Sequence, residues 1–205
     1  MRLSRQQQKQ RTRERLLLAA ETVFRRNGFH QATVEGIAEE AGYSKGAFYA
    51  NFKDKEELFL ALVEMRLNRR ALAIRDTNQE QRPTDEQAVD LAQRFASYAE
   101  SDPGWQQLFF EFWVHASRYP EIGQRFDRAQ TPLRDALTDA VRERMVLPPT
   151  QPPRLVADAI WASLTGVALE SMRAGSQPQA LAETVITGLL RGLSAGGVPP
   201  SRPAN

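Results

Sequence analysis

The first 82 residues contain no proline, and this gap constrains the fold more than any other feature. Proline ends or kinks a helix, so the whole stretch is free to be helical wherever apolar spacing allows it. Apolar residues recur there at intervals of three and four, as on one face of a helix, and glycines interrupt them at positions 28, 36, 42 and 46. No segment of the chain alternates apolar and polar residues as a half-buried strand does. The sequence therefore predicts an all-α protein.

Helices are predicted in this first part over residues 13–27, 34–41, 45–49 and 54–75. Thr33 and Ser44 directly precede two of these helices, and their hydroxyl groups are suited to cap the free N–H groups there. Gly28 and Gly42 follow two of the helices and mark their ends. The second and third helices are joined by a very short connection. This arrangement is a helix-turn-helix, which presents its second helix to a DNA major groove about 12 Å wide.

Within residues 13–60, a set of motif residues is more specific than the helical pattern alone. They are Ala20 to Phe24, Thr33-Val34, Ile37-Ala38, Ala41-Gly42-Tyr43-Ser44, Phe48-Tyr49, Phe52, Lys55 and Leu58. Together they resemble the DNA-binding domain of the TetR (tetracycline-repressor) family. One departure is Ala32, where many members carry a second threonine, and a phosphate contact is expected to be missing there.

The resemblance implies an organisation in two domains and about nine helices. Residues 1–53 are expected to form a three-helix DNA-binding domain with a basic N-terminal arm. Residues 54–194 are expected to form a helical domain for effector binding and dimerisation, followed by a disordered tail over 195–205. The implied function is a ligand-responsive transcriptional regulator, a repressor that a small apolar or aromatic effector releases from a palindromic operator. A transcriptional activator of the same family is the alternative.

The charge distribution agrees with a DNA-binding end. Residues 1–53 carry a net charge of +5 and the rest of the chain −3, within a total of +2. A basic module followed by an acidic body suits binding to a polyanion, although a solvated basic surface has the same pattern. Minor-groove or phosphate contacts are possible for the basic residues of the arm, and solvation without contact is the alternative. These residues are Arg2, Arg5, Lys9, Arg11 and Arg13.

The residues predicted to contact DNA are Thr33, Ser44, Lys45, Gly46, Ala47, Tyr49, Asn51 and Lys55. Lys45 begins the expected recognition helix, where it can reach a guanine edge or a phosphate. Gly46 and Ala47 are small enough to allow close approach to the groove floor. Tyr49 and Lys55 resemble the phosphate-contacting tyrosine and lysine of the family. A purely structural role, as a cap, a packing residue or a solvated side chain, is the alternative for each.

The second part of the chain predicts further helices over residues 84–99, 102–117, 120 onward with a kink or an interruption at Pro132, 154–174 and 179–194. The helix over 102–117 is apolar nearly all round, which predicts burial on all sides. An effector-binding site is predicted at Phe95, Tyr98, Trp105, Phe109, Phe112, Trp113, His115 and Trp161. Aromatic residues that simply fill the core are the alternative. Glu111, His115 and Tyr98 are expected to anchor a hydrogen-bonding or positively charged group of the ligand.

A homodimer is predicted from the last two helices, because small residues there let two backbones approach closely. The interface residues are Ala162, Gly166, Val185, Gly188, Leu189 and Gly192. The partners expected are a double-stranded DNA operator, a small-molecule effector and a second copy of the chain.

Several classes of protein are excluded by what the sequence lacks. It has no cysteine, two distant histidines, no phosphate-binding glycine loop and no nucleophile-elbow pattern, so neither an enzyme, a cofactor nor a metal site is expected. Its longest uncharged apolar run, residues 159–169, is far shorter than the ~20 residues of a membrane helix. The polar N-terminus lacks a secretory signal, so a cytoplasmic protein is expected. A helical small-molecule carrier with no DNA role is the remaining alternative.

Overall fold

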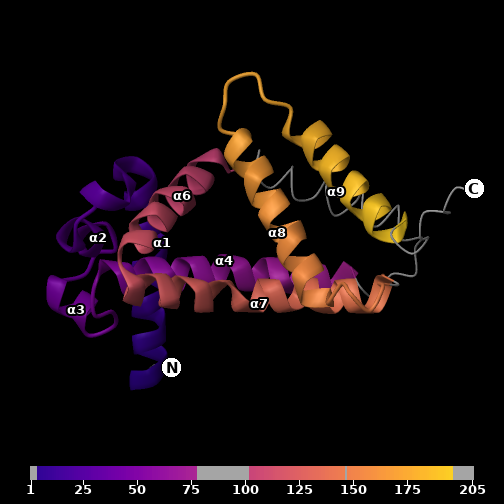
Figure 1. Cartoon of the computed structure of the whole chain (residues 1–205). Coiled ribbons are helices and arrows are strands. Elements are labelled where there is room, and N and C mark those ends of the chain that lie inside the picture. The colour runs from indigo at the N-terminus through magenta and orange to yellow at the C-terminus, as the bar shows by residue number, and fades with distance from the viewer. Residues whose placement is uncertain (1–3, 78–101, 146, 196–205) are drawn as a thin grey trace, which may run out of the picture. The chain divides into compact units, whose positions relative to one another are not determined.

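The computed structural model describes residues 4–77, 102–145 and 147–195, which are helical with short connections and contain no strand (Figure 1). The all-α prediction is therefore confirmed for these residues. The helix predicted over 84–99, with Phe95 and Tyr98, lies outside the described residues, as does most of the tail predicted over 195–205. The described helices are α1 (Arg5–Gln31), α2 (Val34–Glu40), α3 (Lys45–Tyr49), α4 (Lys55–Thr77), α6 (Pro103–Arg118), α7 (Pro120–Arg144), α8 (Pro153–Glu170) and α9 (Pro178–Ala195).

The chain divides into two compact units. Unit 1 comprises Met1–Arg69 with Gln107–Thr131, and unit 2 comprises Arg70–Gln106 with Pro132–Asn205. Helices α4, α6 and α7 each contribute residues to both units. Unit 1 thus takes in more of the chain than the predicted DNA-binding domain, and the functional boundary at residue 53 stays a prediction.

Helix α1 begins eight residues before the predicted start, because Ser4 forms a capping box with Gln7. The Ser4 hydroxyl accepts a hydrogen bond from the Gln7 backbone N–H at 3.2 Å, and the Gln7 side chain accepts one from the Ser4 N–H at 2.8 Å. The polar arm from Arg5 onward is therefore helical. Apolar periodicity does not detect this part of the helix, because the arm has no apolar face.

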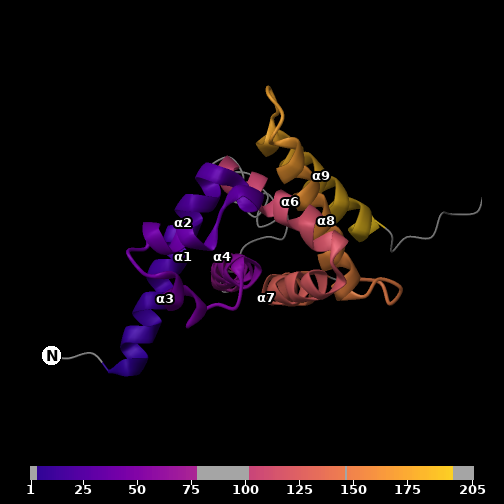
Figure 2. The ribbon, with the colours of Figure 1, turned by 90° about the vertical axis from the view of Figure 1, so that its left-hand side faces the viewer.

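The core of unit 1 is built from phenylalanines. Phe29 follows a kink at Gly28, which has a φ of 73° that other residues rarely adopt. Phe29 lies 4.9 Å from the ring of Phe112 of α6, and Phe112 stacks on Phe59 of α4 at 4.4 Å between ring centroids. All three rings are buried. Helix α2 packs against both α1 and α3 (Figure 2). On α3, Phe48 is fully buried, and its ring lies 5.9 Å from that of Phe52 between centroids.

Helix α7 continues through Pro132, so of the kink or interruption predicted there, the interruption is wrong. Two side chains directly before the proline support the preceding turn. Gln130 donates a hydrogen bond to the Phe126 carbonyl at 3.3 Å, and Thr131 donates one to the Asp127 carbonyl at 3.3 Å.

Unit 2 contains the second half of α7 together with α8 and α9, which pack against each other. The inner face of α8 is apolar, with Val156, Ile160 and Leu164 buried. None of the helices in the described part of the chain is both long enough and apolar enough to cross a membrane.

Candidate functional site

Helices α2 and α3 are capped as the sequence predicts. The Thr33 hydroxyl accepts a hydrogen bond from the Gly36 N–H at 3.1 Å, and the Ser44 hydroxyl accepts one from the Ala47 N–H at 3.2 Å. The turn between the helices depends on Gly42, whose φ is 72°. Both caps are confirmed, while the phosphate contacts of Thr33 and Ser44 stay predictions.

Helix α3 has one outer and one inner side. Lys45, Gly46 and Tyr49 are exposed and Ala47 is half-buried, whereas Phe48 is fully buried. The four predicted DNA-contacting residues of α3 thus belong to its accessible part. A side chain with this placement can reach a base edge without disturbing the core.

Lys45 forms an ion pair that sequence reasoning missed. Its ammonium group donates a hydrogen bond to the carboxylate of Glu35, on the first turn of α2, and lies 5.9 Å from the centre of the Tyr49 ring. This hydrogen bond raises the pKa of Lys45 and lowers the pKa of Glu35. The candidate base-reading lysine therefore stands beside an acidic group, and neither side chain is buried.

Asn51 and Arg13 are bound to each other within unit 1. The Asn51 side chain donates to the Ala47 carbonyl at 2.8 Å, and the Asn51 carbonyl accepts a hydrogen bond from Arg13 at 3.1 Å. The Arg13 guanidinium also lies 4.2 Å from the centre of the Phe52 ring. Arg13 thus ties α1 to the segment after α3, and the DNA contact of Asn51 stays a prediction.

The ammonium group of Lys55 points into the protein. It donates hydrogen bonds to the carbonyl oxygens of Phe29, His30 and Ala32 at 2.8, 3.2 and 2.9 Å. Burial lowers the pKa of Lys55. Since an ammonium group has three N–H donors, these carbonyls occupy it fully, and its predicted phosphate contact stays a prediction.

The N–H groups of the same short turn are bound by Glu111 of α6. Its carboxylate oxygens accept hydrogen bonds from the backbone N–H groups of Phe29 and His30 at 3.1 and 3.2 Å. They approach Gly28 so closely that a Cβ atom there would lie 3.2 Å from Oε2. Glu111 is therefore engaged with the backbone after the α1 kink, and its contact with a ligand stays a prediction.

The predicted effector-binding residues are divided between the two units. Phe109, Phe112, Trp113 and His115 belong to unit 1, while Trp105 and Trp161 belong to unit 2. The rings of Phe109, Phe112 and Trp113 all lie within 5.8 Å of the Phe126 ring of α7, measured between centroids. This packing gives them a structural role, and their contact with a ligand stays a prediction.

Helix α6 is not buried on all sides, so that prediction is wrong. Gln107, Val114 and Ser117 form an exposed line along it, and the Val114 residue is 55% exposed. The helix is apolar all round in composition, but only the face that carries Phe109 and Phe112 is covered.

His115 lies beside the α1 turn as well. Its Nε2 atom is 3.7 Å from the nearer carboxylate oxygen of Glu56, and its ring is 5.1 Å from that of Phe29. Burial is the main cause that lowers its pKa. Among the described residues, no group of three or more histidine, aspartate and glutamate side chains is placed to hold a metal ion.

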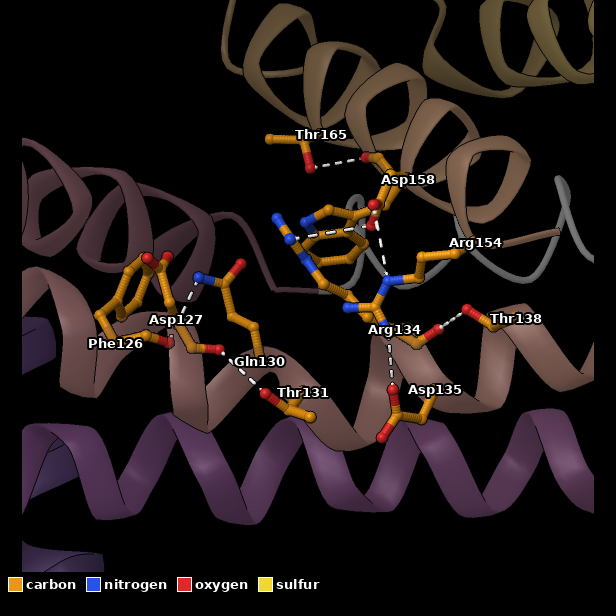
Figure 3. A network of polar contacts seen from close by, with 11 residues as sticks. Phe126, Asp127, Gln130, Thr131, Arg134, Asp135, Thr138, Arg154, Asp158 and Thr165 are labelled. Carbon is orange, nitrogen blue, oxygen red and sulfur yellow. Dashed lines mark hydrogen bonds and ion pairs between the residues drawn. The ribbon is translucent and has the colours of Figure 1, made fainter. Parts of the chain in front are cut away.

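A polar network joins α7 to α8 within unit 2 (Figure 3). Arg154 lies 2.7 Å from a carboxylate oxygen of Asp135 and 3.5 Å from one of Asp158, and Arg134 lies 3.7 Å from the other oxygen of Asp158. Sequence reasoning missed this network. The available signal was the opposite charge of Arg154 and Asp158 at a spacing of four residues on one helix.

The predicted dimer residues lie on the outer surface of α8 and α9. Ala162, Gly166, Gly188 and Gly192 are exposed, and no described side chain comes within 4 Å of a Cβ atom built on any of these three glycines. Val185 and Leu189 are half-buried, and three leucines of the same two helices are exposed, namely Leu155, Leu169 and Leu181.

Two family models together match most of the chain. The model described as bacterial regulatory proteins, tetR family, matches residues 16–62, and that of the BetI-type transcriptional repressor, C-terminal, matches residues 85–195. The chain therefore belongs to the TetR family of bacterial transcriptional regulators, and its second half is of the BetI type.

Individual relatives agree with this family. The HTH-type transcriptional activator FasR of Mycolicibacterium smegmatis is 30% identical over 99 residues, which are 48% of this chain and 45% of FasR. The HTH-type transcriptional repressor BepR of Brucella suis is 46% identical over 52 residues, a quarter of each chain. The matched part spans less than half of either relative.

Solved structures show the same fold over nearly the whole chain. The transcriptional regulator FadR of Bacillus subtilis, solved in complex with stearoyl-CoA, superposes with a TM-score of 0.69 at 19% identity. The superposition covers 87% of this chain and 98% of FadR. At this identity the likeness establishes the fold alone.

Proposed function

We propose that this protein is a ligand-responsive, DNA-binding transcriptional regulator that works as a cytoplasmic homodimer and not as an enzyme. The observation that carries the proposal is the capped, exposed helix α3, which presents Lys45 and Tyr49 while Phe48 fixes it to the core. A helix held in this way can enter a major groove, and the basic charge of residues 1–53 supplies attraction to phosphates.

The homodimer rests on the outer surface of α8 and α9. Exposed apolar and small side chains on two adjacent helices are costly in water, and a twofold partner covers them. Two copies of α3 then face two half-sites one helical turn apart, about 34 to 36 Å, or a multiple of it. Equilibrium sedimentation tests this: the chain should have twice its mass of 23.1 kDa, and Gly188→Arg should return it to the monomer.

The effector is proposed to be small and largely apolar, and to release the protein from its operator as a repressor. FadR of Bacillus subtilis, a neighbour in fold, was solved with stearoyl-CoA, so an acyl-CoA is one compound to test. An activator would instead gain DNA affinity on binding its effector. A ligand shifts DNA binding only if it prefers one state, and a preference of ~1–3 kcal/mol changes operator affinity roughly 5- to 150-fold.

Helix α6 offers a route for such coupling. It carries Glu111, which holds the α1 turn by its N–H groups, and His115, which lies beside Glu56 at the start of α4. Lys55, next to Glu56, holds the carbonyl groups of the same turn. A displacement of α6 therefore disturbs the turn that joins α1 to α2, and with it the placement of α3.

The direct experiment is selection of duplexes from a random pool by the full-length protein, followed by binding measurements at several salt concentrations. A near-palindromic sequence should emerge, and its affinity should fall steeply with salt. If no sequence is enriched while a small molecule binds tightly, the protein is a carrier and the proposal fails.

A further inference from the structure

Three polar atoms of the α7–α8 network are buried without a hydrogen-bond partner among the described residues. They are Arg134 Nε, Asp158 Oδ1 and Trp161 Nε1. Trp161 as a whole is only 5% exposed. Most buried polar groups in proteins are paired, because leaving one unpaired loses the hydrogen bond it had with water. Three unpaired atoms therefore call for an additional polar partner.

The three residues all belong to unit 2. Asp158 and Trp161 are three residues apart on α8, a spacing that places them on the same face. Arg134 of α7 approaches Asp158, with 3.7 Å between Nη1 and Oδ1, too long for a hydrogen bond (Figure 3). A single small group can thus face all three side chains.

The kinds of atom limit what that group can be. Arg134 Nε and Trp161 Nε1 carry hydrogens and can only donate, whereas a carboxylate oxygen of Asp158 can only accept. One carbonyl oxygen has two lone pairs and can accept from both donors. An N–H next to that carbonyl can donate to Asp158. An amide combines these two functions in adjacent atoms.

The charge of the network favours the same choice. Arg134 and Arg154 balance Asp135 and Asp158, so the four side chains sum to zero formal charge. A carboxylate ligand would place an unbalanced negative charge beside Asp158. An ammonium ligand would leave Arg134 and Trp161 without an acceptor. Both leave at least one of the three buried atoms without a hydrogen-bond partner, which is unfavourable.

We propose that Arg134, Asp158 and Trp161 form the anchor for an uncharged amide group of the effector. This inference rests on the proposed function in taking the ligand to be the effector, and it adds the chemical class that the ligand must contain. Trp161 belongs to the predicted ligand-binding residues, while Arg134 and Asp158 are new to the site.

The test is calorimetric titration of the full-length protein with two matched sets of probes. Octanamide, octanoate and octylammonium share one tail, and benzamide, benzoate and benzylammonium share another, so that the head group is the only variable within a set. We expect the amide of at least one set to bind about tenfold or more tighter than its charged counterparts.

Two substitutions probe the donors. Trp161→Phe keeps a ring but removes the N–H, and Arg134→Met keeps the apolar stem but removes the guanidinium. Each should weaken amide binding about five- to tenfold, the effect of losing one hydrogen bond. Arg142→Met is the matched control, because Arg142 lies on the same helix and pairs with Asp139 on the surface. It should leave amide affinity unchanged.

Asp158→Asn separates a ligand contact from a merely structural role. It gives the network a net positive charge, so carboxylates should gain at least tenfold relative to amides. A structural role predicts lower stability with no exchange of head-group preference. Circular dichroism of each variant confirms that its helices are intact.

Three results would overturn the site: no binding of either amide, equal binding of all head groups, or amide affinity unchanged by Trp161→Phe. Bound water would then suffice as the partner of the buried atoms. Operator binding is measured separately. Amide binding without any effect on operator affinity contradicts the proposed regulation and leaves the site intact. If a ligand releases the protein from its operator and Trp161→Phe leaves the affinity for that ligand unchanged, only the proposed site is contradicted.

Discussion

The turn after α1 in unit 1 and the α7–α8 network in unit 2 differ in how their polar groups are hydrogen-bonded. In unit 1, Glu111 accepts hydrogen bonds from the N–H groups of one short turn and Lys55 donates to its carbonyl groups. In unit 2, Arg134, Asp158 and Trp161 each have one buried atom that forms no hydrogen bond within the described part of the chain. The backbone groups of the first turn are held by two side chains of the protein itself. The second region is the anchor that we propose for a ligand.

The largest effect on stability is expected from removing one aromatic ring from the core of unit 1. Phe112→Ala removes a fully buried ring that stacks on Phe59, and should lower the free energy of unfolding by about 3–5 kcal/mol. Val114→Ala, on the exposed line of the same helix, should change it by less than about 0.5 kcal/mol. Urea denaturation measures both. Equal losses would contradict the division of α6 into a buried and an exposed face.

Removing the carboxylate that holds the α1 turn should have the next largest effect. Glu111→Ala leaves two backbone N–H groups without their charged acceptor and should cost about 2 kcal/mol. Hydrogen exchange at the amides of Phe29 and His30 should accelerate at the same time. Gln107→Ala, on the exposed line of α6, is the control. Unchanged exchange in Glu111→Ala would show that the turn does not depend on this side chain.

Two glycines of the helix-turn-helix should respond in opposite directions. Gly42→Ala places a side chain at a φ of 72° and should destabilise by about 1–2 kcal/mol, although no atom lies within 4 Å of the new Cβ. Gly46→Ala lies within α3, where alanine is the better helix former, and should be neutral or stabilising by up to about 1 kcal/mol. Thermal unfolding compares them. A similar loss at both positions would contradict the role given to the turn.

The smallest effect is a pH dependence in unit 1. Burial lowers the pKa of His115, outweighing the attraction of Glu56, while His30, Lys55 and Arg118 lower it further. The unfolded chain therefore takes up a proton at a higher pH than the folded one. Stability should fall as pH drops below the ordinary value of 6.5.

His115→Gln should remove part of that slope between pH 7 and pH 5.5, measured by urea midpoints. His30→Gln removes only a smaller cause of the lowered His115 pKa and should leave most of the slope in place. A slope that is identical in wild type and His115→Gln would contradict this assignment.

Local signals explain why so much of the first domain was predictable. A cap and its N–H are three residues apart, as for Thr33 and Gly36, and a glycine with positive φ interrupts regular helix, as at the α1 kink and in the turn after α2. The start of α1 was missed because a polar arm has no apolar period to detect.

Long-range polar contacts escaped prediction for a different reason. Glu111 and Phe29 are 82 residues apart, and Lys55 reaches carbonyl groups on another helix. Nothing in a single sequence specifies such a partner. Arg134 was overlooked in the same way, because its surroundings are set by the packing of α7 on α8.

The central claim is that α3 reads a DNA sequence, and fluorescence anisotropy tests it directly. Wild type, Lys45→Ala and Lys53→Ala are titrated against a duplex selected from the random pool and against its scrambled version, at low and moderate salt. Wild type should prefer the selected duplex at least about 10³-fold. Lys45→Ala should lose roughly 5- to 150-fold of that preference. Lys53 is exposed and follows α3, so Lys53→Ala removes a positive charge without touching α3 and should weaken both duplexes alike. Equal binding of both duplexes by wild type, or an unchanged preference in Lys45→Ala, would contradict the claim.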